Sequence, residues 1–344
     1  MDDNLTRRTV LAASLAALPM AGLASAEPKR KQLLAPALKP GDTVALIAPA
    51  SKLPDAKEAE EACSFIKALG YRPIMSENAN KSWGYLSGTD EERAHDLNWA
   101  FKNPEVRGIV CIKGGYGAMR ILPRLDYAAI RRHPKVLVGY SDVTALLNAI
   151  YKKTGLVTFH GPVATSTARE YSTNWLQKAI GHASRVGTFA QPDAATASKG
   201  DLQLATLHGG KARGRLVGGN LTLLSHLMAT PYEPDFAGKI LFIEDVTEAP
   251  YRIDRMLTQL WLNGALGKVK GVAVGQFTNC DEQDSQSPWK CKDVIELRLK
   301  GLGVPVLTGL PIGHVADKLT LPVGAMAVLD ADKQTLSVVE PAVC

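Results

Sequence analysis

Short apolar runs alternate with stretches of helical spacing along the first half of the sequence, and this alternation constrains the fold most. Thr43–Ala48, Gly108–Lys113 and Val136–Tyr140 are largely apolar, as is typical of strands covered on both faces. Between them, Pro54–Leu69 and Thr89–Phe101 have helical spacing, and the second opens on a threonine cap and an acidic first turn. Strands that alternate with helices predict an α/β fold with a parallel sheet.

The second half predicts another compact α/β part. Its apolar runs Lys239–Ile243 and Val269–Phe277 are expected to be strands, and Pro250–Leu262 and Cys291–Lys300 to be helices. The segment between the two halves is rich in Ala, Ser, Thr and Gln and weakly periodic, which predicts a linker or a peripheral segment. The predicted parts are therefore residues 41–165, 166–214 and 215–344.

The first 26 residues are predicted to be an export signal. Thr6–Leu11 has a twin-arginine pattern, an apolar Ala-rich stretch runs on to Leu23, and Ala24–Ala26 is a cleavage site of small residues. Val10, where Phe is commoner, leaves the general secretory route as an alternative. The apolar stretch is too short to span a bilayer, and no cysteine at the cleavage site offers a lipid anchor. We expect a periplasmic protein with no membrane anchor after signal removal.

The charge of the sequence is a mild excess of cations, with 40 Lys and Arg against 34 Asp and Glu and a formal net charge of +6. Removing the signal deletes two acidic and two basic residues, so the mature charge stays the same. No run of Lys or Arg is long enough to follow a phosphate backbone, and we predict no nucleic-acid partner. Weak attraction to anionic material of the cell envelope is compatible with this charge.

Five cysteines are present, and two of them bracket a polar loop. Cys280 and Cys291 would be the best disulfide candidates in an oxidising periplasm. Cys63 and Cys111 lie in apolar surroundings and are expected to be buried thiols. No C-x-x-C, H-E-x-x-H or Cys/His cluster occurs, so we predict no metal site.

A candidate nucleophile lies where a strand meets a helix. In the run VLVGYSDVTALL, residues 136–147, Ser141 follows the apolar strand and opens the helix. Such a sharp turn exposes a serine hydroxyl at the carboxyl edge of a sheet, and the amide N–H of Asp142 can donate to an oxyanion there. Val143 replaces the second glycine of the G-x-S-x-G pattern, so the alternative is that Ser141 only caps the helix.

A serine nucleophile needs a histidine base. His314 lies in the Gly- and Pro-rich turn TGLPIGHVAD after an apolar run, where catalytic residues are commonly held. His160, at the end of a short strand, is its rival. For either histidine taken alone, a structural role is the simpler interpretation.

The third group of such a site is a carboxylate that orients the histidine. Glu244 ends the apolar strand Ile240–Ile243, where a charge is costly unless it is paired or at a sheet edge. An ion pair with Arg252 or Arg255, or a role for the neighbouring Asp245, would explain the same pattern.

Gly114-Gly115-Tyr116-Gly117 follows a predicted strand. Glycines let the backbone approach a ligand and direct N–H groups towards it, although a plain tight turn explains the pair equally well. The motif is neither G-x-G-x-x-G nor a P-loop, and we predict no nucleotide cofactor and no other cofactor.

Taken together, the sequence resembles the muramoyltetrapeptide (LD-) carboxypeptidase family, which also contains the microcin-immunity peptidases. The matching pieces occur in family order and cover most of residues 41 to 330. They are VALIAPAS, GYLSGTDEERAHDLNWAF, IKGGYGAMRILPRLDY, LVGYSDVTALLNAI, FHGP, GRLVGGNLTLLSHLMATPY, KILFIEDVTEAPYRIDRML and GLPIGH.

The resemblance implies a Ser-Glu-His triad, which falls on Ser141, Glu244 and His314. The oxyanion donors would be Asp142 N–H and an N–H of the glycine turn, for which we favour Gly115 over Gly114. It also implies a flavodoxin-like N-terminal domain that carries the serine and a C-terminal β/α domain that carries the other two groups. The active site would lie in the cleft between these domains. Family members are homodimers, so we expect a homodimer.

The activity implied is removal of the terminal D-Ala from a murein tetrapeptide through an acyl-enzyme. Tyr116, Arg252 and Arg255 are the candidate substrate-binding residues, the two arginines because they could bind a free carboxylate. Two alternatives are a peptidase like the microcin-immunity branch and a non-catalytic periplasmic binding protein for muropeptides. Members that recycle murein commonly lack an export signal, so the predicted signal departs from that pattern.

Overall fold

The computed structural model describes residues 32–193, 202–284 and 286–344. They belong to one compact unit that begins at residue 31. The predicted export signal, residues 1–26, lies outside the described residues. None of the helices in the described ranges is long and apolar enough to cross a membrane.

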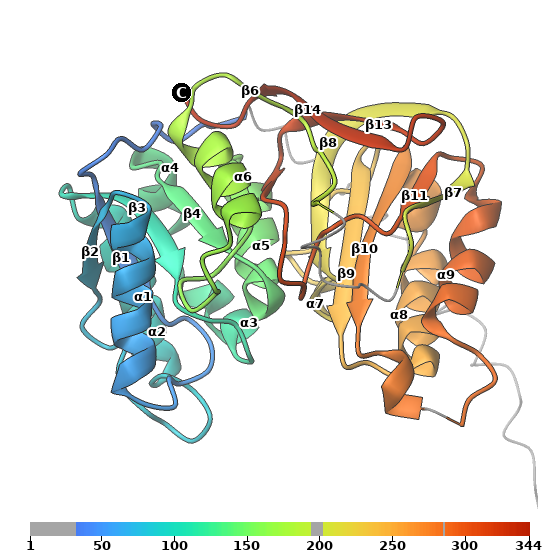
Figure 1. Ribbon diagram of the computed structural model, residues 1–344. Helices are drawn as coiled ribbons and strands as arrows, with labels where there is room; N and C mark the ends of the chain where they lie inside the picture. Colours follow the sequence, from blue (N-terminus) through green and yellow to red (C-terminus); the bar gives the residue numbers. More distant parts are fainter. Residues whose placement is uncertain (1–31, 194–201, 285) are drawn as a thin grey trace, which may run out of the picture. The chain divides into compact units, whose positions relative to one another are not determined.

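The first sheet has six strands in the order β12-β5-β4-β3-β1-β2, and β1 to β5 pair in parallel (Figure 1). Leaving β12 aside, the order 2-1-3-4-5 is that of flavodoxin-like folds, which confirms the predicted fold class. The strands are β1 (Thr43–Ile47), β2 (Arg72–Met75), β3 (Val106–Cys111), β4 (Val136–Gly139), β5 (Thr158–His160) and β12 (Leu321–Val323).

The second sheet has eight strands in the order β6-β14-β13-β8-β9-β10-β11-β7. Its central strands β8 to β11 pair in parallel, and the strands on both sides of them pair antiparallel. The strands are β6 (Arg185–Thr188), β7 (Ala205–His208), β8 (Lys211–Asn220), β9 (Ile240–Val246), β10 (Gly271–Thr278), β11 (Val306–Thr308), β13 (Met326–Asp330) and β14 (Thr335–Pro341).

Nine α-helices are formed in the described part of the chain. Thr89 caps α2 as predicted, since its hydroxyl accepts from Glu92 N–H at 3.2 Å and Glu92 accepts in return from Thr89 N–H at 2.8 Å. Helices α2, α4, α5, α7, α8 and α9 contact one another in that order, so a single helical layer runs along both sheets. The helices are α1 (Ala56–Ala68), α2 (Asp90–Lys102), α3 (Ala118–Ile121), α4 (Tyr127–Arg132), α5 (Thr144–Thr154), α6 (Glu170–Gly181), α7 (Leu221–Leu227), α8 (Pro250–Leu262) and α9 (Cys291–Leu299).

The segment predicted as a linker or peripheral segment, residues 166–214, holds regular structure. It contains α6, β6, β7 and the start of β8. Strands β6 and β7 are the two edges of the second sheet, and they need no apolar run because most of their residues are not buried. The polar composition of residues 166–214 therefore gave no indication of these two strands.

One strand crosses from the second half of the chain to the first sheet. β12 pairs antiparallel with β5, with Leu321 opposite His160, although more than 150 residues separate them. The main apolar cluster likewise draws on both sheets, with Val138 and Phe159 from the first and Phe242 from the second. The two sheets therefore share a core.

The predicted disulfide between Cys280 and Cys291 is not formed. Both cysteines are free thiols, and both are buried in an apolar cluster that includes residues of α8 and α9. The neighbouring Cys280 thiol and burial raise the pKa of Cys291, so the thiolate needed for disulfide exchange is disfavoured. The polar loop between the two cysteines suggested an exposed disulfide, but both side chains are buried.

Candidate active site

The first sheet has a topological switch point between β1 and β3, where parallel sheets commonly form a binding crevice. Ser51 follows β1, and the Gly114–Gly117 turn follows β3. The two meet at this edge, since Tyr116 N–H donates to Ser51 Oγ at 3.0 Å. β4 pairs with β3, so Ser141, just beyond β4, comes to the same edge.

Ser141 lies in a strained turn. Its φ of 63° is in the left-handed region, which a non-glycine residue occupies at a cost. A 3-10 turn, Ser141–Val143, leads directly into α5. Gly139 makes the turn possible, because a Cβ at that position would lie 2.6 Å from a methyl carbon of Val143. This is the geometry of a nucleophile elbow and not of an ordinary helix cap.

The glycine turn after β3 packs against the elbow. A Cβ on Gly114 would lie 2.9 Å from Ser141 Cβ, 3.1 Å from its Oγ and 3.4 Å from Asp142 N. Gly115 has a φ of 111°, and a Cβ there would meet Ser51 Oγ at 2.2 Å. In the described ranges the amides of Gly115 and Asp142 donate no hydrogen bond. Both amides are thus available to a ligand at this edge.

The side chain of Asp142 ties the elbow to the glycine turn. It is buried, and its Oδ2 accepts from Ala118 N–H at 2.7 Å. Burial raises the pKa of Asp142 to about 6, although the bond from Ala118 and the charge of Arg93 act in the opposite direction. Arg93 is itself buried and donates to Gly117 O at 2.8 Å. These contacts therefore fix the positions of the Gly115 and Asp142 N–H groups.

Glu244 and His314 meet beneath this edge. Glu244 on β9 is fully buried, and His314 Nδ1 lies 2.8 Å from its Oε2. Gly313 permits the contact, because a Cβ on Gly313 would lie 2.4 Å from Glu244 Oε2. In the part of the chain that the structure describes, the other ring nitrogen of His314 has no hydrogen-bond partner. That nitrogen is free to receive a proton.

The pair shifts the pKa of both partners. Burial alone would raise the pKa of Glu244, but attraction to His314, its hydrogen bond and the nearby ring of His160 lower the pKa to about 2. Burial alone would lower the pKa of His314, but the charge of Glu244 and its hydrogen bond raise it overall. Glu244 is therefore ionised and stabilises the protonated form of His314.

A second histidine faces the same carboxylate. His160 is buried, and its Nε2 lies 3.6 Å from Glu244 Oε1, longer than a hydrogen bond. No other described group bonds to Oε1 or to either ring nitrogen of His160. The sequence presented His160 as a rival base. In the structure His160 lies near Glu244 Oε1, the carboxylate oxygen that does not bond to His314.

The elbow helix is bonded to the strand beside Glu244. Thr144 Oγ1 accepts from Asn220 N–H at 3.0 Å, and Asn148 donates to Gly218 O at 2.8 Å. Asn220 lies opposite Glu244 in the pairing of β8 with β9. The ring of Tyr140, the residue before Ser141, lies 4.8 Å from the His314 ring. These contacts bring the serine and the histidine-carboxylate pair to one place from two sheets.

The three candidate substrate-binding residues lie on two separate elements, the glycine turn and α8. Tyr116 is exposed and stacks edge-on against Tyr85 at 5.4 Å, beside the glycine turn. Arg252, on α8, lies 3.5 Å from Glu248, and Arg255 lies over the Tyr251 ring. Neither arginine pairs with Glu244, so the alternative of a structural ion pair there is wrong.

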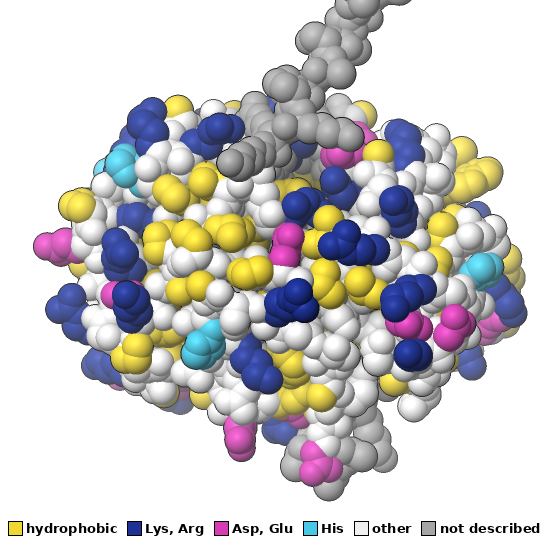
Figure 2. Space-filling view, turned by 90° about the horizontal axis from the view of Figure 1, so that it is seen from above, with side chains coloured by type: hydrophobic (Ala, Val, Ile, Leu, Met, Phe, Trp, Pro, Cys, Tyr) yellow, Lys and Arg dark blue, Asp and Glu magenta, His cyan; other side chains and the backbone are white. Residues whose placement is uncertain are grey.

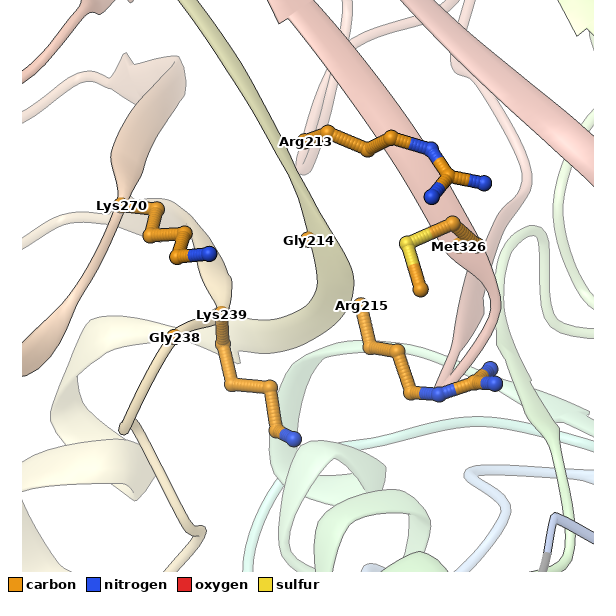
Figure 3. Close-up of a pocket in the computed structure, with 7 residues that line it drawn as sticks. All are labelled: Arg213, Gly214, Arg215, Gly238, Lys239, Lys270 and Met326. Carbon is orange, nitrogen blue, oxygen red and sulfur yellow. The ribbon is translucent and has the colours of Figure 1, made fainter.

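A basic recess lies at the opposite end of β9. It has a volume of about 370 Å³ and is lined by Arg213, Arg215, Lys239 and Lys270, with Met326 and two glycines. Figure 3 shows that the charged ends point in different directions and do not converge. Lys and Arg side chains are also spread among apolar ones over the face of the molecule seen in Figure 2. The recess is a basic surface and not a cradle for one small anion.

Serine catalysis requires an exposed hydroxyl, a histidine held by a carboxylate and amide donors for the oxyanion. The chain collects these groups at the edge where its two sheets share a core, which is the organisation of a serine hydrolase. Sequence profiles of the LD-carboxypeptidase N-terminal and C-terminal domains match residues 44–161 and 213–329. The chain belongs to the LD-carboxypeptidase family of serine peptidases.

Individual relatives agree with this placement. A probable murein peptide carboxypeptidase of Bacillus subtilis is 40% identical over 299 residues, which cover 87% of this chain and 92% of that protein. The solved muramoyltetrapeptide carboxypeptidase of Oxalobacter formigenes has a TM-score of 0.72 at 32% identity, covering 86% of this chain and 97% of that one. The microcin C7 self-immunity protein has a TM-score of 0.82 at 29% identity, covering 91% and 100%.

Proposed function

We propose that the protein removes the terminal D-alanine from murein tetrapeptides through an acyl-enzyme on Ser141. The observation that carries this proposal is the bonded pair of His314 and buried Glu244 next to the strained elbow of Ser141. The names of the B. subtilis and O. formigenes relatives supply the substrate class.

The reaction follows from the positions of these groups. Ser141 Oγ attacks the carbonyl carbon of the last peptide bond and passes its proton to the free nitrogen of His314. The Asp142 and Gly115 amides stabilise the oxyanion that forms. His314 then gives the proton to the leaving amine as the C–N bond breaks. Water, deprotonated by His314, attacks the acyl-enzyme, and the proton returns to Ser141 as the peptide is released.

The export signal predicted from residues 1–26 supports a periplasmic location for this reaction, where the enzyme would meet peptide stems directly. Secretion of a fusion that carries residues 1–26 tests the location, and retention in the cytoplasm would contradict it. The homodimer expected from the family is tested by light scattering of the purified protein. A monomeric mass would contradict it.

The decisive assay is incubation of the purified protein with a murein tetrapeptide, followed by mass spectrometry. We expect loss of one alanine and no further trimming. A pentapeptide ending in D-Ala-D-Ala should stay intact, because its last bond follows a D-residue. No release from the tetrapeptide would contradict the proposal.

A second candidate is suggested by the TM-score of 0.82 to the microcin C7 self-immunity protein. Such an enzyme would hydrolyse the amide of a peptidyl-nucleotide analogue. The identity to the murein peptide carboxypeptidase, 40%, favours murein. Competition between the two substrates at equal concentration decides between the two candidate functions. Faster cleavage of the peptidyl-nucleotide analogue would make the second candidate the preferred one.

The packing of the glycine turn yields a sharp prediction. Gly114→Ala should lower kcat/KM about 100-fold, because the added methyl would crowd Ser141 Oγ and cover the Asp142 amide, one oxyanion donor. Gly114 has no positive φ, so the backbone can accept alanine. The matched control is Gly267→Ala, whose methyl meets nothing within 4 Å and should change nothing. Equal kcat/KM values for the two variants would show that the glycine turn is not part of the active site.

A further inference from the structure

Lys318 lies beside the candidate active site. Only 8% of its surface is exposed, and its Nζ lies 5.2 Å from the centre of the Tyr140 ring. The His314 ring lies 4.8 Å from that same ring. The charge of Lys318 also acts to lower the pKa of His314, so the ammonium lies near the histidine as well as near Tyr140, the residue that precedes Ser141.

The carboxylates around Lys318 are engaged with other groups. Asp317 accepts from Arg169 at 2.7 and 3.0 Å, and Glu244 is bonded to His314. Over the described ranges, the ammonium of Lys318 donates no hydrogen bond and forms no ion pair. Burial lowers the pKa of Lys318 to about 8, although the charges of Glu244 and Asp317 act in the opposite direction. A buried cation of this kind is costly until an anion joins it.

The backbone holds Lys318 in place. Its N–H donates to Ser172 Oγ of α6 at 2.9 Å, and the next amide, that of Leu319, donates to Pro311 O at 2.8 Å. The aromatic face of Tyr140 gives the ammonium a further favourable contact. The cation is thus preorganised, which reduces the cost of ordering it when a ligand binds.

We propose that the Lys318 ammonium binds the free carboxylate at the end of the substrate peptide. The leaving amino acid carries that carboxylate one carbon away from the amine that His314 protonates, so a cation near His314 lies on the leaving-group side. The ion pair gives the ammonium the direct carboxylate partner that it lacks among the described residues. The inference rests on the proposed function, and it replaces Arg252 and Arg255 as the carboxylate-binding candidates.

The test compares two substrates, a murein tetrapeptide and the same peptide with a C-terminal carboxamide. Wild-type enzyme should prefer the acid, and Lys318→Met should lower kcat/KM for the acid about 100-fold while changing that for the amide less than about threefold. Lys318→Arg, which keeps the charge, should retain most of the preference. The matched control is Lys57→Met on the exposed face of α1, which should behave as wild type.

The pH profile is a second readout. Tyr140, Glu244, His314 and Asp317 face Lys318, and Arg169 is paired with Asp317. As Lys318 loses its proton, kcat/KM for the acid should fall with a midpoint near pH 8. The amide should lack this alkaline limb, and so should Lys318→Met with either substrate.

Each outcome has a distinct meaning. An unchanged acid-to-amide ratio in Lys318→Met, with only a shift in the acid limb that reports His314, would overturn the inference and leave Lys318 as a modulator of that histidine. Absence of cleavage of both peptides by wild-type enzyme would instead overturn the proposed function and the carboxylate site with it. Lys318→Gln, measured in parallel, guards against misfolding of the methionine variant.

Discussion

Ser141→Ala is expected to lower kcat/KM for D-alanine release by about 10⁴-fold or more, because no other group can form the acyl-enzyme at the elbow. The fold should be unaffected. The Ser141 hydroxyl makes no hydrogen bond with any described residue, and alanine can adopt the same φ of 63° at a similar cost. Mass spectrometry of released alanine measures the loss of activity. Calorimetry should show that the variant still binds the tetrapeptide.

The matched control is Ser64→Ala on α1, where the hydroxyl bonds only to Glu60 O, and wild-type activity is expected. If Ser141→Ala kept more than a hundredth of the activity, another nucleophile would be at work. Ser51 would be the next residue to test, because its hydroxyl lies against the same glycine turn.

Glu244→Gln should lower kcat by about 10³- to 10⁴-fold, as expected when the carboxylate that orients a catalytic histidine becomes an amide. The charge of Glu244 raises the pKa of His314, so its removal should lower that pKa and move the acid limb of the remaining activity to lower pH. A pH profile of kcat/KM measures the shift. A limb that stayed in place, or moved up, would contradict the pairing.

Stability offers an independent check of the same variant. The pKa of Glu244 is lowered to about 2 from an ordinary value of 4.5, so its charge stabilises the fold above pH 4.5 and this contribution is lost as pH falls towards 2. The difference in thermal unfolding between wild type and Glu244→Gln should therefore be largest near neutral pH and shrink in acid. The control Glu61→Gln, in an exposed pair with Lys57, should show no such dependence.

The sequence was informative wherever local chemistry decides the structure. Apolar runs predicted β1, β4 and β9, and Thr89 with Glu92 predicted the start of α2. Glu244 could be singled out because a charge at the end of an apolar strand requires a partner. That partner, His314, is 70 residues away, and the resemblance to a family, not any local pattern, indicated it.

Long-range pairing explains what could not be predicted. β12 is three residues long, and nothing in Leu321–Val323 indicates that it joins β5 of the other sheet. His160 could not be placed on Glu244, nor Lys318 beside Tyr140, without that crossing. Loop composition also does not reveal that Cys280 and Cys291, which the structure describes as free thiols, are both buried.

The crossing of β12 bears on how this molecule can be divided. A fragment that ended before β8 would leave β5 as an unpaired edge and expose the apolar residues that face β9. Exposed strand edges invite association with other chains. Residues 44–161, which match the N-terminal domain profile, are therefore not expected to fold on their own. A truncated protein of that length should aggregate unless the rest of the chain is supplied as a separate polypeptide.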